Sequence, residues 1–205
     1  MTRGKVQGAR SNIPKRPDNK EQEARGKVQG VTSPNDQTTK RPDDQTTKQM
    51  KTELILVGKT INTHFVAGIN DYTERINHYM PFHITVIPEL KNTKSLSEEL
   101  QKEREGELIL KQIQQTDTVV LLDEHGREYR SVEYAAWIEK KQLSCRRLVF
   151  VVGGPYGFSP AVYQRANEQI SLSKMTFSHQ MVRLIFTEQL YRACTIIKGE
   201  PYHHE

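Results

Sequence analysis

From residue 50 onward, short apolar runs alternate with segments whose apolar residues recur every three or four positions. Continuous apolar runs are typical of buried β-strands, because a strand covered on both faces is apolar along its length. We therefore expect four strands, at 52–58, 82–88, 117–123 and 147–152, and a brief extended piece at 194–199.

The segments between these runs carry the spacing and the start signals of helices. Apolar residues recur at helical intervals from 65 to 79. Ser95 and Glu98 form a possible capping box, and Ser159 followed by Pro160 is a typical helix start. Helices are accordingly expected at 65–79, from 95 to about 115, from 131, from 160 and from 178 to 193.

The alternation of strands and helices predicts an α/β fold with a mainly parallel sheet and helices on both faces. In such sheets, ligands bind at the carboxyl ends of the strands. Three loops are expected at that edge, at 123–126, 153–157 and 171–178. Position alone therefore selects these loops as the candidate functional site.

The first 49 residues differ in character from the rest of the chain. They repeat short motifs, such as RGKVQG at 3–8 and 25–30, and they contain no aromatic residue. So few apolar side chains cannot offset the entropy of ordering a chain, so we expect disorder in 1–49. The abrupt change favours Met50 as the natural start and 1–49 as a non-native extension, although an RNA-contacting arm stays open. One domain is expected, at 50–205.

The positive charge of the chain lies in the same N-terminal segment. Residues 1–49 hold 11 of the 30 Lys and Arg residues and 6 of the 25 Asp and Glu residues, which leaves 19 of each sign in 50–205. The net charge of +5 therefore describes the first 49 residues. The expected domain is neutral, so its charge does not by itself indicate a nucleic-acid-binding protein.

Several classes of protein are disfavoured by what the sequence lacks. Cys145 and Cys194 form no C-x-x-C motif, no Cys and His residues have zinc spacing, and we expect two buried free thiols and no metal. No run approaches the roughly 18 apolar residues of a membrane helix, and the N-terminus has no apolar signal region. A cytoplasmic protein without a membrane anchor is expected.

The loop after the fourth expected strand reads FVVGGPYGFS, at 150–159. Its glycines have neither the G-x-G-x-x-G spacing of dinucleotide-binding turns nor the lysine of a phosphate-binding loop. Glycine lets a ligand lie directly against the backbone, which suits a nucleoside without a triphosphate. An ordinary tight turn is the alternative interpretation.

Four segments occur in an order that identifies a family: VVGGPYGFS, SLSKMTFSHQMVR, EQLYRA and the terminal EPYHHE. With LLDEHG at 121–126, they make residues 50–205 resemble the RlmH family, the ribosomal RNA large-subunit pseudouridine methyltransferases of the SPOUT (trefoil-knot) class. The resemblance does not extend to residues 1–49.

The resemblance implies an activity, a cofactor and an assembly. It implies that S-adenosyl-L-methionine donates a methyl group to N3 of a pseudouridine in 23S ribosomal RNA, on the assembled ribosome. It further implies a homodimer and a C-terminal trefoil knot, which general topology rules would not predict. The cofactor contacts implied are Leu122, Gly153, Leu172, Ser173, Lys174, Met175, Thr176 and Phe177.

The same resemblance draws attention to four residues as candidates for catalysis. His179 is expected to accept the imide proton of the base or to hold the base in place. Arg183, one helical turn later, is expected to bind an RNA phosphate. Tyr202 and His203, in the terminal PYHHE, are expected to contact a base. The alternatives left open are a packing histidine, a solvated arginine and a frayed terminus.

Two positions depart from the family pattern. Tyr156 replaces an acidic or small residue, which is expected to alter the rim of the substrate pocket. Ser178 replaces a proline, which is expected to loosen the approach to His179. Two other functions stay open from the residues alone: a non-catalytic ribosome- or RNA-binding protein of the same fold, and a different nucleotide-binding α/β enzyme.

Overall fold

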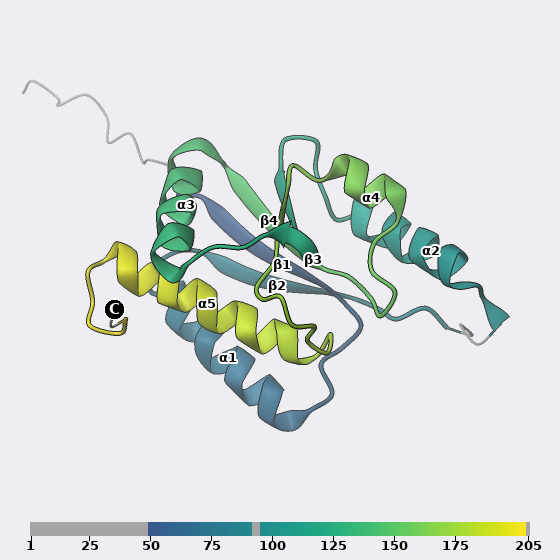
Figure 1. Cartoon of the computed structure of the whole chain (residues 1–205), viewed down its shortest axis with the longest axis horizontal. Helices are drawn as coiled ribbons and strands as arrows, with labels where there is room; N and C mark the ends of the chain where they lie inside the picture. The colour runs from purple at the N-terminus through teal and green to yellow at the C-terminus, as the bar shows by residue number, and fades with distance from the viewer. Residues whose placement is uncertain (1–48, 92–94, 204–205) are drawn as a thin grey trace, which may run out of the picture. The chain divides into compact units, whose positions relative to one another are not determined.

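The computed structural model describes residues 49–91 and 95–203, so the prediction of disorder in 1–49 lies outside the described residues except at Gln49. Strands and helices alternate for most of the chain, as expected (Figure 1). The strands are β1 (Lys51–Val57), β2 (Phe82–Ile87), β3 (Thr118–Arg127), β4 (Arg147–Val152) and β5 (Glu168–Ile170). The helices are α1 (Thr63–Asn77), α2 (Glu98–Leu110), α3 (Ser131–Ser144), α4 (Pro160–Arg165) and α5 (Met181–Ile197).

The five strands form one sheet in the order β2-β1-β4-β3-β5, and each of its four strand pairs is parallel. This confirms the expected α/β class. Because all strands run the same way, the loops that follow them meet at one edge of the sheet. The trefoil knot stays a prediction.

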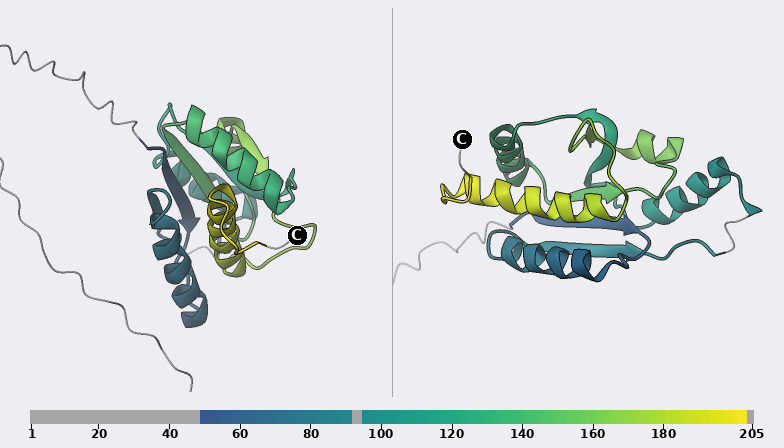
Figure 2. Two further views of the ribbon diagram at one scale, coloured as in Figure 1. Left: turned by 90° about the vertical axis from the view of Figure 1, so that its left-hand side faces the viewer. Right: turned by 60° about the horizontal axis from the view of Figure 1, so that its bottom comes forward.

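Helices cover both faces of the sheet, as predicted (Figure 2). On one face, α1, α3 and α5 pack over alternate strand residues such as Leu54 and Phe150. On the other, α2 and α4 pack over the residues between them, such as Ile55 and Val149. The period of two along each strand thus builds two separate cores from continuously apolar runs.

Several details differ from the sequence-based expectations. The piece 194–199 is not extended, because α5 continues to Ile197, and the short strand β5 was not predicted. α2 begins at Glu98 with Ser97 rather than Ser95 as N-cap, and it ends at Leu110 instead of near 115. β3 continues past 123, but its pairing with β5 is interrupted between Leu122 and Arg127.

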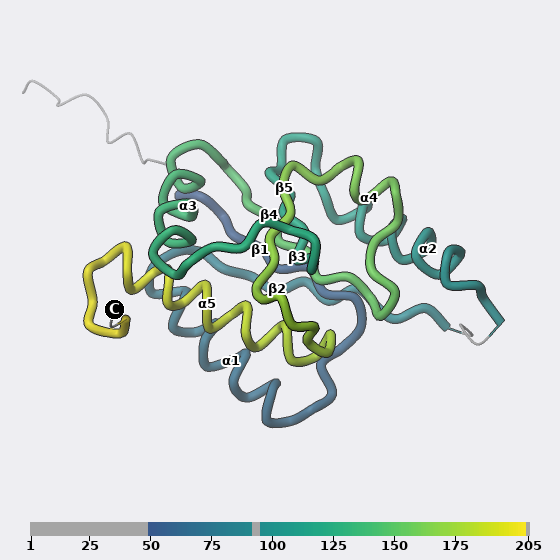
Figure 3. Tube along the Cα trace, viewed as in Figure 1, coloured from purple at the N-terminus to yellow at the C-terminus, as the bar shows by residue number. Residues whose placement is uncertain are grey.

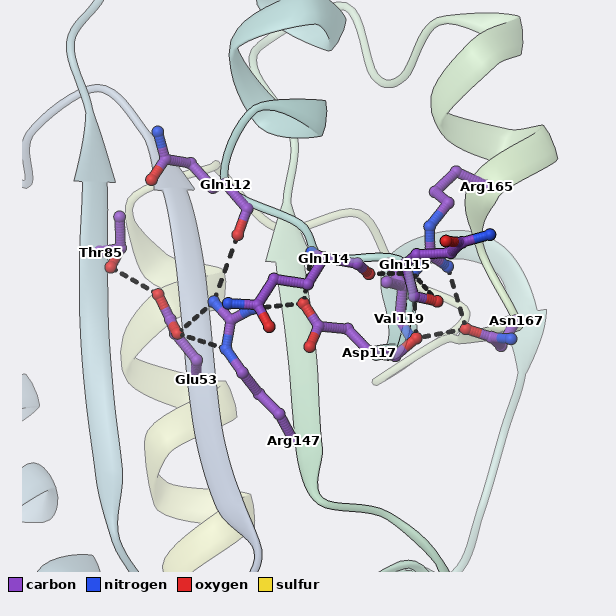
Figure 4. Close-up of polar contacts among 10 residues, drawn as sticks. All are labelled: Glu53, Thr85, Gln112, Gln114, Gln115, Asp117, Val119, Arg147, Arg165 and Asn167. Atoms are coloured by element: carbon purple, nitrogen blue, oxygen red, sulfur yellow. Dashed lines mark hydrogen bonds and ion pairs between the residues drawn. The ribbon is translucent and has the colours of Figure 1, made fainter.

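A polar network ties the strands together at the opposite edge, near their amino ends (Figure 4). Arg147 donates to Glu53 at 2.6 and 3.0 Å and is also paired with Asp117. Thr85 donates to the other oxygen of Glu53 at 2.6 Å. Burial acts to raise the pKa of Glu53, but the hydrogen bonds from Thr85 and Arg147 outweigh it, so the pKa lies below its ordinary value. This edge is therefore a structural clamp, and the loops at the other edge are free for function.

Candidate functional site

The three loops selected from the sequence line one cavity of about 540 Å³ at the carboxyl edge of the sheet. This volume lies within the range of small-molecule sites. One wall is residues 122–125, where the pairing of β3 with β5 is interrupted, and a second is the 153–158 turn after β4. The third is 170–179, the connection from β5 to α5 (Figure 3). Segments far apart in sequence thus converge on one cavity.

The lining of the cavity combines apolar walls with acidic groups. Leu122, Leu172 and Phe177 contribute apolar surface, together with Val152 and Ile170. Asp123 and Glu124 add two carboxyl groups, while none of the described residues that line the cavity is a lysine or an arginine. Such a lining suits a flat nucleoside with a positive charge and disfavours a polyphosphate.

Asp123 is fixed by three hydrogen bonds. Its carboxylate accepts from the Tyr163 hydroxyl at 2.6 Å, from the His125 amide at 2.8 Å and from the His125 ring at 3.0 Å. Burial acts to raise its pKa, but the bonds from Tyr163 and His125 outweigh it and place the pKa below its ordinary value. Asp123 is therefore a permanent negative charge in the wall of the cavity at neutral pH.

The 171–176 segment is held by its own side chains. The Ser171 hydroxyl donates to the Ser173 carbonyl at 2.8 Å, and the Ser173 hydroxyl accepts from the Met175 amide at 2.9 Å. Thr176 contacts Glu124 at 3.4 Å, which links this loop to the first wall. Met175 is 74% exposed, although it also lines the cavity.

The cofactor contacts implied by the resemblance mostly gather at this cavity. Seven of the eight line it: Leu122, Gly153, Leu172, Ser173, Met175, Thr176 and Phe177. Lys174 is exposed and is not among the lining residues in the described part of the chain. Their role as cofactor contacts stays a prediction.

Packing within the protein, rather than room for a ligand, accounts for the glycines at 153 and 154. A Cβ on Gly154 would lie 2.2 Å from a carboxyl oxygen of Glu105, and one on Gly153 would lie 3.1 Å from the Phe158 ring. The space that a side chain would need is thus filled by the protein itself. Room for a ligand does not explain the glycine at 154; the close approach of Glu105 does.

His179 is exposed and lines the cavity just before α5 begins. The Ser178 hydroxyl accepts from the Met181 amide at 3.2 Å, and the Ser178 carbonyl accepts from the Val182 amide at 3.0 Å. These bonds satisfy amides at the start of the helix. Ser178 therefore holds the turn that carries His179, contrary to the expectation that it loosens the turn. Tyr156 lines the cavity and is 46% exposed, and its expected effect on the rim of the substrate pocket stays a prediction.

Arg183 does not occupy the position that its predicted role requires. Its side chain is fully buried and donates to the carbonyls of Val57 and Gly58 at 2.7 and 3.0 Å and to the Thr60 hydroxyl at 2.9 Å. A guanidinium enclosed in this way cannot bind an RNA phosphate. The prediction of a phosphate contact is wrong, because helical spacing placed Arg183 near His179 but not on an exposed face.

Tyr202 and His203 lie at the other end of α5 and do not line the cavity. The Tyr202 ring packs on Tyr191 at 4.8 Å, with the Arg192 guanidinium 4.9 Å from its centre. The Tyr202 hydroxyl donates to Glu188 at 3.2 Å, and Nδ1 of His203 is buried without a hydrogen-bond partner. The tail is therefore packed rather than frayed, but one chain does not bring it to the cavity.

Sequence reasoning missed two residues that shape the site. Tyr163, on α4, anchors Asp123 and lines the cavity. Glu105, on α2, packs behind the glycine turn from the other side. Tyr163 lies one helical turn after Ser159, so the predicted start of α4 placed it near the edge of the sheet; for Glu105 the sequence offered only a run of charged residues.

The described residues show neither a membrane-spanning helix nor a metal site. No helix among them is long and apolar enough to cross a bilayer, and they contain no cluster of three potential metal-binding side chains. Cys145 and Cys194 are free, and only Cys194 is fully buried.

Comparison with known proteins gives the family. Residues 50–203 match the family described as predicted SPOUT methyltransferase. The chain is 64% identical over 157 residues to the ribosomal RNA large subunit methyltransferase H of Bacteroides fragilis and 63% identical to that of Phocaeicola vulgatus. The protein of the same name from Porphyromonas gingivalis is 54% identical. Each alignment covers 76% of this chain and 100% of the relative. The chain therefore belongs to the SPOUT methyltransferases, within their ribosomal RNA large subunit methyltransferase H group.

Proposed function

We propose that the chain is an S-adenosyl-L-methionine-dependent methyltransferase that methylates N3 of a pseudouridine in 23S ribosomal RNA. The relatives, aligned over 157 residues of this chain, carry the name of ribosomal RNA large subunit methyltransferases, and residues 50–203 match the SPOUT methyltransferase family. The observation that carries the proposal is the cavity, whose walls are apolar and acidic and whose described lining lacks lysine and arginine.

The residues present fit this cofactor. The adenine base needs apolar surfaces on its faces, which Leu122, Leu172 and Phe177 supply. The sulfonium and the amino group are positive, and the carboxylates of Asp123 and Glu124 are their natural counterparts. Ser173 and Thr176 offer polar groups for the edges of the ligand. A polyphosphate nucleotide would instead meet two carboxylates and no cation.

The chain has little covalent chemistry of its own to perform. When bound, the cofactor supplies a methyl group on a sulfur that is already electrophilic. The protein contributes orientation, exclusion of water and removal of one proton. We assign the last task to His179, whose exposed ring at the mouth of the cavity can accept the imide proton from an incoming base or hold the base in line.

The position of the tail supports a homodimer. α5 has 17 residues and is about 25 Å long, and it separates the cavity at its amino end from Tyr202 and His203 beyond its carboxyl end. A tail that contacts the substrate base must therefore come from a second copy. We propose that two chains pair so that the tail of each faces the cavity of the other.

The substrate partner is proposed to be an assembled ribosome in the cytoplasm. Residues 50–205 carry equal numbers of acidic and basic side chains, which does not favour tight binding to free RNA by charge alone. A large particle offers shape as well as phosphate, so it can be recognised by a local surface.

Two measurements test the proposed function. S-adenosylhomocysteine should raise the melting temperature of the protein, while ATP and NAD should not. Labelled S-adenosylmethionine should then transfer its methyl group to 23S RNA within whole ribosomes. Binding without transfer to ribosomes or free subunits would indicate a non-catalytic RNA-binding protein, and a response to ATP or NAD alone would overturn the cofactor assignment.

A further inference from the structure

Glu105 is a charged residue in an unusual place. It lies on α2 and is only 4% exposed. One carboxyl oxygen accepts from Gln101 at 2.8 Å, whereas the other is buried and has no hydrogen-bond partner. Glutamates are rarely buried unless they are paired, because an unsatisfied buried oxygen is costly. This cost calls for a compensating role.

The carboxyl group packs directly against the glycine turn. Its unpaired oxygen would lie 2.2 Å from a Cβ at Gly154, and its carboxyl carbon would lie 2.9 Å from it. The next residue makes a matching approach, because a Cβ at Gly106 would lie 2.2 Å from the hydroxyl oxygen of Ser159. Glu105 therefore supports the turn from behind at Gly154, and Gly106 lets α2 approach Ser159, the N-cap of α4 that follows the turn.

The turn separates Glu105 from the cavity. Gly153, Gly154 and Gly157 line the cavity, while Glu105 is not among the lining residues. The direction of the missing Gly154 side chain is toward Glu105, so the other side of the turn is left to face the ligand. Any influence of Glu105 on the ligand must pass through the position of this backbone.

We propose that Glu105 is a positioning residue that fixes the 153–157 turn against the cofactor, and that Gly154 is glycine to admit it. This inference rests on the proposed cofactor. The volume of the Glu105 side chain, rather than its charge, is what sets the position of Gly154. Changes at Glu105 therefore alter the affinity for the cofactor and not the chemistry of methyl transfer.

The environment of Glu105 favours its neutral form. Burial raises the pKa of the carboxyl group, the hydrogen bond from Gln101 opposes the rise, and the nearby carboxylate of Glu89 adds to it. Glutamine has the same shape as a protonated glutamate. Glu105→Gln should therefore preserve the contact with Gly154, whereas Glu105→Ala should remove it.

Reciprocal size changes test the contact. We expect Glu105→Ala and Gly154→Ala each to weaken binding of S-adenosylhomocysteine about tenfold in calorimetry, the first by leaving the turn unsupported and the second by a clash. Glu105→Gln should stay within about threefold of wild type. In the double variant, the new methyl group at 154 fills part of the vacated space, so affinity should recover to within about threefold. Maximal turnover at saturating cofactor should change less than about twofold in the two single variants of Glu105, which does not line the cavity.

The outcomes separate this proposal from the proposed function. If the wild type binds S-adenosylhomocysteine, the cofactor assignment holds whatever the variants do. The role of Glu105 would then be overturned by unchanged affinity in Glu105→Ala, or by a loss of affinity in the double variant that equals the sum of the two single losses. Absence of binding by wild type would overturn the cofactor assignment. Amide hydrogen exchange at 154–158 in the ligand-free protein tests the contact whether or not the cofactor assignment holds. Exchange should be faster in Glu105→Ala than in wild type. Glu103→Ala, which changes an exposed residue of the same helix, is the control and should leave the exchange rate unchanged.

Discussion

At the scale of single residues, the site depends on how firmly its charges are held. The Asp123 side chain is 8% exposed, yet its carboxylate stays ionised because three hydrogen bonds from Tyr163 and His125 offset the burial. A carboxylate fixed in this way needs no reorganisation when a cation arrives. The contribution of Asp123 to binding affinity should therefore depend on the charge of the ligand.

Replacement of Asp123 by asparagine tests this dependence. Asp123→Asn should weaken S-adenosylmethionine about tenfold, and S-adenosylhomocysteine, which lacks the sulfonium charge, less than about threefold. Calorimetry of both ligands measures the ratio. Because the pKa of Asp123 lies below its ordinary value, the wild-type ratio should be constant from pH 6 to 9. Asp71→Asn, on the exposed surface of α1, serves as control; equal losses for both ligands would contradict the charge argument.

At the scale of elements, the two edges of the sheet have separate duties. Arg147, on β4, joins Glu53 on β1 to Asp117 just before β3, at the edge away from the cavity. At the other edge, Arg183 joins the first turn of α5 to the end of β1. Each clamp fixes elements whose local sequence does not determine their relative position.

The first clamp makes stability depend on pH. The pKa of Glu53 is lowered in the folded protein, so its contribution is present above the unfolded pKa of about 4.3 and is lost as pH falls through the folded pKa. Glu53→Gln should lower the free energy of unfolding by about 2 kcal/mol at pH 7. The difference from wild type should shrink toward zero near pH 3 in denaturant titrations. A difference independent of pH would show that the charge of Glu53 is not the cause.

The second clamp should affect stability and activity together. Arg183→Met keeps most of the volume but leaves the carbonyls of Val57 and Gly58 without donors, which should cost about 3 kcal/mol of stability. The loss of activity at low temperature should be smaller than that of His179→Ala, because Arg183 does not reach the substrate. Urea titration and single-turnover methylation measure the two effects. If Arg183→Met were as stable as wild type but had lost salt-dependent affinity for RNA, Arg183 would have to contact an RNA phosphate after all.

The sequence predicted the elements better than their ends. Long apolar runs identified four strands because their pattern was continuous. β5 has only three residues and depends on its pairing with β3, so no local pattern announced it. The β-branched residues at 195–197 suggested a strand, but Cys194 and Thr195 are buried against the core and hold this segment in α5. Tertiary packing here outweighs local propensity.

The candidate site likewise has parts that could be predicted from the sequence and parts that could not. The three loops could be predicted because their position follows from the order of parallel strands. The burial of Arg183 could not, since helical spacing shows which residues share a face but not what covers it. The role of Glu105 was equally hidden, because its charge marks a solvated helix until α4 and the glycine turn are in place.

At the scale of the whole molecule, one chain carries the parts of the proposed active site at opposite ends of α5. His179 lies beside the cavity, and Tyr202 packs on Tyr191 near the other end. If each tail serves the cavity of a second copy, the two functions can be divided between chains. A chain in which His179 has been replaced should then still supply Tyr202 and His203 to the cavity of the other chain in the dimer.

Mixing two inactive variants tests this arrangement. His179→Ala and Tyr202→Ala should each form dimers with little methyltransferase activity. In a mixed dimer, the cavity with an intact His179 receives the intact tail of the other chain, while the second cavity lacks both. Random re-pairing of equal amounts makes about half of the dimers mixed, each with one working site, so activity should recover to about a quarter of wild type. If the tail instead served its own chain, neither chain of a mixed dimer would hold both residues at one site and mixing would restore nothing. The recovery of activity must also depend on exchange of chains between dimers. Covalent cross-linking of the two chains within each variant dimer before mixing should therefore abolish the recovery.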